Sequence, residues 1–154
     1  KSIKKMIPQW GKDAIIDGKD KIINLVKYDQ LAIGINSFGS PLAFEDGRYG
    51  SGGDGTYAAS TQDYATAQGA IKSKPEGSPY NFQWTGDTFA NMYLKSVNKA
   101  KGTFDISSKT AKKRLLESLY GEIFDLTDEH NNWINKNIVE PYLSKKIEER
   151  LFDF

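Results

Sequence analysis

The 154 residues of the chain, 38% hydrophobic and 27% charged, suffice for one domain over residues 1–154 and exclude global disorder. The absence of cysteine excludes disulfide bonds and thiolate metal sites, and the net charge of +1 argues against a uniformly basic nucleic-acid binder. No run approaches the roughly 18 apolar residues that cross a bilayer, so we expect no membrane partner.

The N-terminal segment is expected to form one amphipathic helix over residues 1–28. Its apolar residues recur at spacings of three and four, which places them on one side of a helix. They are Ile3, Ile7, Trp10, Ala14, Gly18, Ile22 and Leu25. We expect a bend or a break near Pro8 or Gly11, because proline removes a backbone donor and glycine weakens a helix.

A strand is predicted over residues 31–35, where an apolar run leads into the turn-forming residues 36–40. Residues 45–56 then contain so many glycines that we expect a flexible loop. This loop lacks the Gly-Lys-Ser/Thr ending of a phosphate cradle. Its acidic residues also lack the alternating spacing of a calcium loop, so we expect no cofactor and assign no metal ligand.

In the central part of the chain, the residue patterns predict helices and strands in succession. Residues 57–71 are rich in alanine and glutamine, which favours a short helix. Residues 80–84 alternate between aromatic and polar, which predicts a half-buried strand with three aromatic side chains on one face. Residues 87–98 fit either a helix or a strand. We expect a helix passing into a strand that pairs with residues 102–107.

A helix is then predicted over residues 108–120. Ser108 is a suitable N-cap, because its hydroxyl can accept a hydrogen bond from a free backbone N–H of the first turn. Gly121 follows the last apolar residue of this segment, at the position where glycine commonly ends a helix.

The last helix is predicted over residues 127–151, with Thr127 as its N-cap and negative charge in its first turn. Pro141 lies inside this helix, so we expect a kink or a fresh helix start there. Together these elements predict an α+β fold. A long N-terminal helix and C-terminal helices would pack on a small antiparallel sheet.

The sequence contains no recognisable set of catalytic groups. His130 is the single histidine, and we expect a partly exposed polar residue near a helix cap. No Gly-x-Ser-x-Gly elbow or His-Glu-x-x-His pair occurs, so no catalytic residue is assigned and we expect a protein without enzymatic activity. Carboxylates alone can support glycoside hydrolysis, which keeps a carboxylate-dependent cell-wall hydrolase as an alternative. Its candidate acids are Asp87, Glu117, Glu122, Asp125 and Asp128.

Charge alternates in sign along the chain. Residues 1–28 carry 7 basic and 3 acidic side chains, residues 29–94 carry 3 and 7, residues 95–114 carry 7 and 1, and residues 117–154 carry 4 and 9. Such blocks allow complementary contacts within one copy or between neighbouring copies. The basic run over 95–114 also fits phosphate contacts, so a nucleic-acid-binding accessory protein is the other alternative.

One segment resembles a known family. Residues 81–92, which contain Thr85 and Gly86, resemble the Thr-Gly core of tailed-phage neck and tail-completion proteins, also called virion morphogenesis proteins. Thr88 stands where that family usually has leucine, and Asn91 stands near its usual serine. Two further stretches look like versions found in phages of gut Bacteroides-type hosts. They are residues 34–39 and residues 120–127.

This resemblance implies a virion component at the head–tail junction, assembled in the host cytoplasm. The partners would be copies of itself in a ring and portal, connector or tail proteins, with nonspecific proximity to DNA. The residues that we assign to an interface on this basis are aromatic or basic. They are Trp84, Phe89, Tyr93, Lys95, Lys99, Lys101, Lys112, Lys113 and Arg114.

Overall fold

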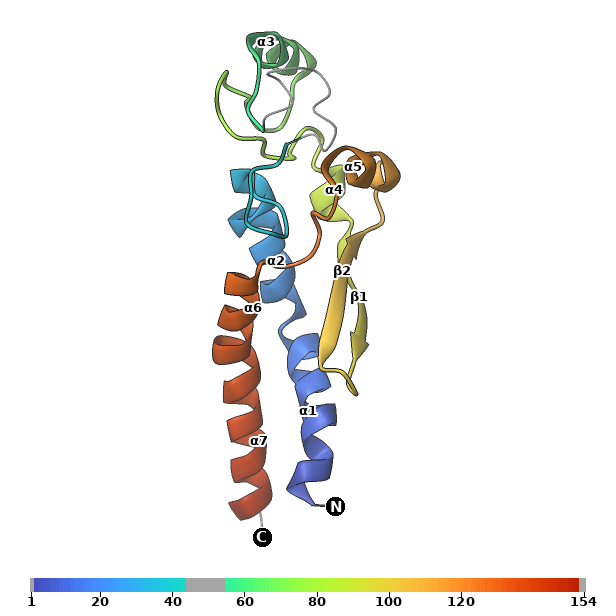
Figure 1. The fold of residues 1–154 in the computed structure, drawn as a ribbon, viewed down its shortest axis with the longest axis vertical. Coiled ribbons are helices and arrows are strands. Elements are labelled where there is room, and N and C mark those ends of the chain that lie inside the picture. Colours follow the sequence, from blue (N-terminus) through green and yellow to red (C-terminus); the bar gives the residue numbers. More distant parts are fainter. Residues whose placement is uncertain (1, 44–54, 153–154) are drawn as a thin grey trace.

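The computed structural model describes residues 2–43 and 55–152. It has the α+β architecture that the sequence predicts, with helices packed on one two-stranded antiparallel sheet (Figure 1). The helices are α1 (Ile3–Asp17), α2 (Lys19–Asp29), α3 (Ala59–Gln68), α4 (Asp87–Ala90), α5 (Lys113–Tyr120), α6 (Asp128–Ile134) and α7 (Glu140–Phe152), and the strands are β1 (Met92–Asn98) and β2 (Thr103–Ser108).

The molecule is elongated, and its two ends are built differently (Figure 1). At one end, α1 packs against α7 in a two-helix stem, and both chain ends lie there. The β1–β2 hairpin lies along α1 and α2. At the other end, α3 and the loops around it sit beyond α2, with α4 and α5 beside the upper end of the hairpin. None of the helices in the described ranges is long and apolar enough to cross a membrane.

The N-terminal helix breaks at Gly18, so the expected break near Pro8 or Gly11 is wrong. Both Pro8 and Gly11 lie within the continuous α1 helix. Gly18 is the C-cap of α1 and the N-cap of α2. A Cβ atom at Gly18 would lie 2.8 Å from the Ile138 Cγ2 atom, whereas one at Gly11 would meet nothing within 4 Å. Gly18 therefore lets the C-terminal helices approach the joint between α1 and α2.

We predict that Gly18→Ala lowers the free energy of unfolding by about 1–3 kcal/mol, because the new methyl group overpacks against Ile138. Gly11→Ala is the matched control, since Gly11 is a helical glycine with open space around it. It should raise the free energy of unfolding by about 0.5–1 kcal/mol through the lower entropy of the unfolded chain. Denaturant titration of both variants measures the two effects. Equal effects would show that Ile138 does not limit the space at Gly18.

Two predicted strands are absent from the described residues. Residues 31–35 instead form a 3-10 turn over Leu31–Ile33, and Ile35 makes one isolated bridge with Pro41. Gly34 has a φ of 81° and ends this turn in the left-handed region. A Cβ there would lie 2.6 Å from the Pro79 Cβ atom. The left-handed conformation of Gly34 therefore depends on the close approach of the loop that holds Pro79. The apolar run over residues 31–35 contains no information about that contact.

The aromatic segment over residues 80–84 is irregular, so the expected strand there is wrong. Phe82 has a φ of 55°, which places its backbone in the left-handed region and interrupts any strand. Pro79 just before it makes an isolated bridge with Thr56. The expected flexible loop over 45–56 lies outside the described residues except for residues 55 and 56.

The hairpin confirms the prediction of a helix that passes into a strand. After α4, β1 pairs with β2 from Met92 opposite Ser108 to Asn98 opposite Thr103, with an irregularity between Leu94 and Ser96. Ser108 is the last residue of β2 and caps no helix. Its hydroxyl donates to the Thr88 carbonyl at 2.9 Å. The helix expected from residue 108 therefore begins only at Lys113, although it does end at Gly121 as predicted.

The C-terminal segment forms α6, a π-helical turn over Asn135–Val139, and α7. Thr127 is the N-cap as predicted, because its hydroxyl accepts a hydrogen bond from the His130 backbone N–H at 3.2 Å. The irregularity expected at Pro141 is the π turn just before it. Proline has no backbone N–H, so the α-helical hydrogen bond at Pro141 is lost. The wider π-helical turn before it accommodates this break in the hydrogen-bond pattern.

Gln30 is a buried polar residue that joins the two ends of the sequence. Its side chain is 0% exposed. Its Nε2 donates to the Asp125 carbonyl at 2.9 Å, and its Oε1 accepts from the Thr127 N–H at 3.0 Å. The His130 Nδ1 atom lies 2.8 Å from the same Oε1, so Nδ1 carries the proton. These bonds fix the C-terminal end of α2 against the start of α6.

Gln30→Leu is expected to lower the free energy of unfolding by about 2–4 kcal/mol, because the Asp125 carbonyl and Thr127 N–H would be buried without partners. Gln68→Leu is the matched control. Gln68 is an exposed residue of α3, and its replacement should change the free energy of unfolding by less than about 0.5 kcal/mol. Thermal or chemical denaturation gives both values. A loss at Gln30 no larger than at Gln68 would contradict the role of the amide.

Candidate functional site

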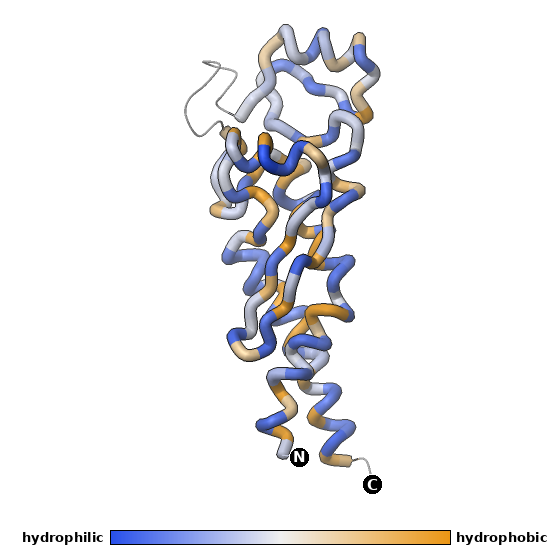
Figure 2. Tube along the Cα trace, turned by 90° about the vertical axis from the view of Figure 1, so that its right-hand side faces the viewer, coloured by the Kyte–Doolittle hydropathy of each residue, from blue (hydrophilic) through white to orange (hydrophobic). Residues whose placement is uncertain are grey.

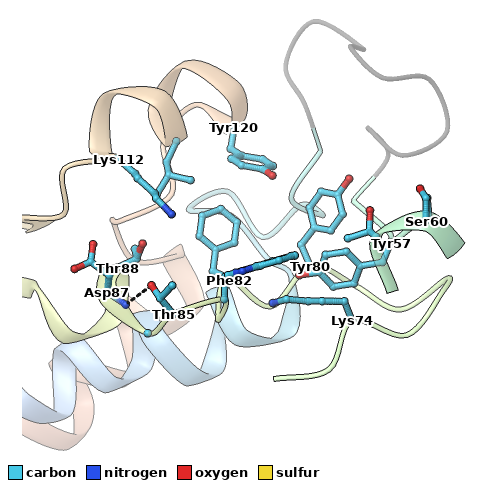
Figure 3. Close-up of a pocket in the computed structure, with 15 residues that line it drawn as sticks. Tyr57, Ser60, Lys74, Tyr80, Phe82, Thr85, Asp87, Thr88, Lys112 and Tyr120 are labelled. Carbon is cyan, nitrogen blue, oxygen red and sulfur yellow. Dashed lines mark hydrogen bonds between the residues drawn. The ribbon is translucent and has the colours of Figure 1, made fainter. Parts of the chain in front are cut away.

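A pocket of about 570 Å³ lies beside the start of α3, at the end of the molecule opposite the stem (Figure 1), and Figure 3 shows its lining side chains. Its walls come from the start of α3, from residues 80–88 and from α5. Most of the larger side chains that line it are aromatic. They are Tyr57, Tyr80, Phe82, Trp84 and Tyr120. Concave surfaces lined by aromatic groups with a few polar groups are typical of binding sites.

The aromatic rings of the pocket pack on one another. The ring centroids of Tyr57 and Tyr80 are 4.9 Å apart, and those of Phe82 and Tyr120 are 5.0 Å apart. Tyr80 also meets Tyr120 edge-on at 6.0 Å. These contacts join the start of α3, the aromatic segment and α5, which are distant in sequence. The left-handed backbone of Phe82 turns its ring toward Tyr120, and such a strained residue is a frequent mark of a functional site.

Lys74 lies at the bottom of this aromatic group and is 3% exposed. Its Nζ donates a hydrogen bond to the Asn81 side-chain oxygen. The ammonium lies 5.3 Å from the Tyr57 ring centroid and 5.9 Å from that of Trp84, within reach of a cation–π interaction. Burial lowers the pKa of Lys74 to about 8.

Asn81 organises the floor around this lysine. Besides Lys74, its side-chain oxygen accepts from the Gln83 N–H at 3.2 Å and from the Tyr57 hydroxyl at 3.3 Å, and its side-chain N–H₂ donates to the Ser73 carbonyl at 3.1 Å. Burial raises the pKa of Tyr57 to about 12, and it also raises the pKa of Tyr120. Both phenols therefore stay neutral in the physiological range.

The Thr-Gly pair forms the turn at the edge of the pocket. Gly86 has a φ of 82° and is the N-cap of α4. The Asp87 N–H donates to the Thr85 hydroxyl at 3.3 Å, and the Asp87 carboxylate accepts from the Thr110 hydroxyl. This turn thus joins the aromatic segment to the chain just before α5. Its hydrogen bonds are structural, and Thr85 and Asp87 contribute polar edges to the pocket.

The aromatic residues that the sequence assigns to an interface occupy three different environments. Trp84 lines the pocket and packs on Tyr64, with centroids 5.6 Å apart. Phe89 is 6% exposed and belongs to the core. Tyr93 is half-buried on β1, with the Lys109 ammonium 5.0 Å from its ring centroid. Only Trp84 of these three lies at the pocket.

The basic residues of the predicted interface spread over the hairpin and α5. Lys112 lines the pocket. Lys113 forms an ion pair with Glu117 at 3.5 Å, and Lys99 donates to the Gln9 side chain at 3.3 Å. The remaining residues of the set are exposed. They are Lys95, Lys101 and Arg114.

The five acidic residues considered for glycoside hydrolysis do not lie together in one site. Glu117, Glu122 and Asp125 line one groove together with Asp105. Burial raises the pKa of Asp125, as do the nearby carboxylates of Asp105, Glu122 and Glu117. The other two candidates lie elsewhere, Asp87 at the Thr-Gly turn and Asp128 in the first turn of α6. Within residues 2–43 and 55–152, no group of three acidic or histidine side chains is arranged to hold a metal ion.

Sequence reasoning misses the residues that build the pocket floor. Lys74 and Asn81 lie in loop segments without helical or strand periodicity, and nothing in their neighbours marks the lysine as buried. The sequence predicts Tyr57 and Tyr120 on two separate helices. Their meeting depends on how α3 and α5 fold over the aromatic segment.

Comparison with known proteins gives no relative from which a function could be transferred. No protein-family model, curated protein or solved structure matches the chain.

The pH dependence of stability tests the burial of Lys74. Its pKa lies near 8 in the folded protein, below the usual 10.5. The unfolded chain therefore binds more protons between these values, and folding stability rises with pH in that window. We predict that the stability of the wild type relative to Lys74→Met is constant below about pH 8 and rises toward pH 10.

The two tyrosines of raised pKa are present in both proteins, so their titration largely cancels in this comparison. Urea titrations at several pH values between 7 and 10 give the difference. A difference independent of pH would mean that the Lys74 ammonium is solvated in the folded protein.

Proposed function

We propose that the protein is a non-enzymatic structural component of a tailed-phage virion, acting at the head–tail junction through assembly with copies of itself and with neighbouring virion proteins. The observation that carries the assembly role is the incomplete burial of two helices. No side chain of α5 or α7 is fully buried, although both helices carry large apolar residues. Elsewhere in the molecule, α1 and α2 each bury three.

The two-helix stem exposes large apolar side chains. Leu151 and Phe152 of α7 are 54% and 70% exposed, and Ile7 of α1 is 38% exposed. Apolar residues continue along both helices toward the free end of the stem (Figure 2). A pair of helices has too little surface to enclose an apolar stripe, which is why bundles use more helices. A further helix or a neighbouring protein on the stem would cover these side chains.

The opposite end carries a second apolar surface around the aromatic pocket. Leu115 of α5 is 56% exposed, Tyr64 of α3 is 60% exposed, and Ile71 is 56% exposed. Pockets lined by tyrosine and tryptophan are typical of the places where an interface is anchored. Apolar surfaces at both ends of an elongated subunit suit a protein that is built into a larger assembly.

The placement in a phage virion depends on the resemblance around Thr85 and Gly86. This pair forms the edge of the aromatic pocket, so the segment of resemblance and the candidate contact surface coincide. On this proposal the partners are portal, connector or tail proteins, and the exposed lysines of the hairpin lie near an acidic neighbour or near DNA.

Replacing the exposed leucines with glutamine is expected to weaken association without weakening the fold. Leu115→Gln and Leu151→Gln together remove apolar area from both surfaces. Each buried leucine side chain contributes roughly 1.5–3 kcal/mol to an interface, so association should weaken by at least about tenfold. Sedimentation velocity and electron microscopy of purified protein measure the oligomer, and denaturation checks the fold.

Lys145→Gln is the control, because Lys145 is an exposed residue of the same helix α7 and its replacement leaves the apolar surface intact. A wild-type protein that stays monomeric at all concentrations and is absent from purified virions would overturn the proposed function.

A further inference from the structure

A second concave surface, which we call the acidic groove, lies between the end of α2 and the start of α6. It encloses about 720 Å³. The carboxylates that line it are Asp29, Glu122, Asp125, Asp128 and Glu129. Among the described residues, no lysine or arginine contributes to its lining. A groove lined by negative charges alone has a negative electrostatic potential, which favours a cationic partner in that space.

Two other observations mark this groove as a contact surface. The Ser37 side chain is 8% exposed, and its hydroxyl has no hydrogen-bond partner within the described part of the chain. A buried hydroxyl without a hydrogen-bond partner is rare in folded proteins. Rotation about the one side-chain torsion of Ser37 would let this hydroxyl accept a hydrogen bond from a donor that enters the groove. Phe38, the next residue in the wall, is 75% exposed and offers an apolar contact beside the carboxylates.

The chain itself carries a cationic element of suitable shape. The turn that joins β1 to β2, residues 99–102, holds Lys99 and Lys101, and both are exposed. The turn lies at the end of a two-stranded ribbon, and entry into a groove would replace the exposed hydrogen bond that Lys99 donates to the Gln9 side chain at 3.3 Å. It lies on the opposite side of α1 and α2 from α6, so it cannot reach the acidic groove of its own copy (Figure 1).

We propose that the hairpin turn of one copy docks into the acidic groove of the next, with Lys99 and Lys101 placed among the groove carboxylates. The inference rests on the proposed assembly function and names the contact through which copies join. Because the turn and the groove are different surfaces on opposite sides, the contact is heterologous. Repeated contacts of this kind build a closed ring or an open filament instead of a two-fold dimer.

Charge exchange tests the pairing. The turn-reversed variant carries Lys99→Glu and Lys101→Glu, and the groove-reversed variant carries Asp29→Lys and Glu122→Lys. Asp29 is the last residue of α2, where a lysine is favourable to the helix dipole, and Glu122 is exposed in a loop, so both changes spare the fold. Each variant alone should associate at least about tenfold more weakly than the wild type at low salt.

A mixture of the two variants should regain association, because the acidic turn of one then meets the basic groove of the other. The assembly of the wild type should weaken as salt rises from about 0.05 M to 0.5 M, since screening shortens the range of these charges. The control carries Lys136→Glu and Lys145→Glu, the same change of net charge on exposed residues of the C-terminal helices, and should assemble like the wild type.

The results of these experiments test docking of the turn and the proposed function independently. Wild-type assembly that resists salt and both reversals would overturn docking of the turn while leaving an assembly role intact. Loss of assembly in the groove-reversed variant alone would assign the groove to a different basic surface of the neighbouring copy and overturn docking of the turn. A wild type that is monomeric under every condition would overturn docking, and its absence from purified virions as well would overturn the proposed function.

Discussion

The hydrogen bonds of Gln30 are the constraint on which the arrangement of this molecule depends. The amide is fully buried at the end of α2, and both of its ends are used by the backbone that leads into α6. A buried amide is stable only when its donors and acceptors are satisfied, so the two segments are held in one register. The α6–α7 segment then runs back along α1, and its Ile138 reaches the small surface of Gly18. The stem, the acidic groove and the position of His130 all follow from this junction.

The opposite end of the molecule depends on a different kind of interaction. Aromatic rings from three segments surround Lys74, whose ammonium has exchanged water for Asn81 and two ring faces. Desolvation of a cation costs free energy, and the lowered pKa of Lys74 expresses that cost. The rings that line the pocket above it thus also shield the lysine from water.

Both ends leave apolar area uncovered, while the middle of the molecule presents charge. Apolar surfaces supply most of the free energy of association, and charges of opposite sign select the partner and its orientation. An elongated molecule with apolar ends, an acidic groove and a basic turn has both kinds of surface. The basic turn and the acidic groove do not pair within one copy, because the hairpin lies on the opposite side of α1 and α2 from α6 (Figure 1).

The sequence by itself determined the elements whose signals are local. Helical periodicity predicted the N-terminal and C-terminal helices, Thr127 predicted a cap, and Gly121 predicted a stop, because each depends on side chains within one or two turns. Tertiary structure alone decided the break at Gly18, the left-handed Phe82 and the burial of Gln30 and Lys74. Each of these depends on a group outside its own helix or turn, whether the Ile138 methyl, the Tyr120 ring, the Asp125 carbonyl or the Asn81 amide. Residue patterns carry no record of such partners, because burial of a polar side chain is set by what packs around it.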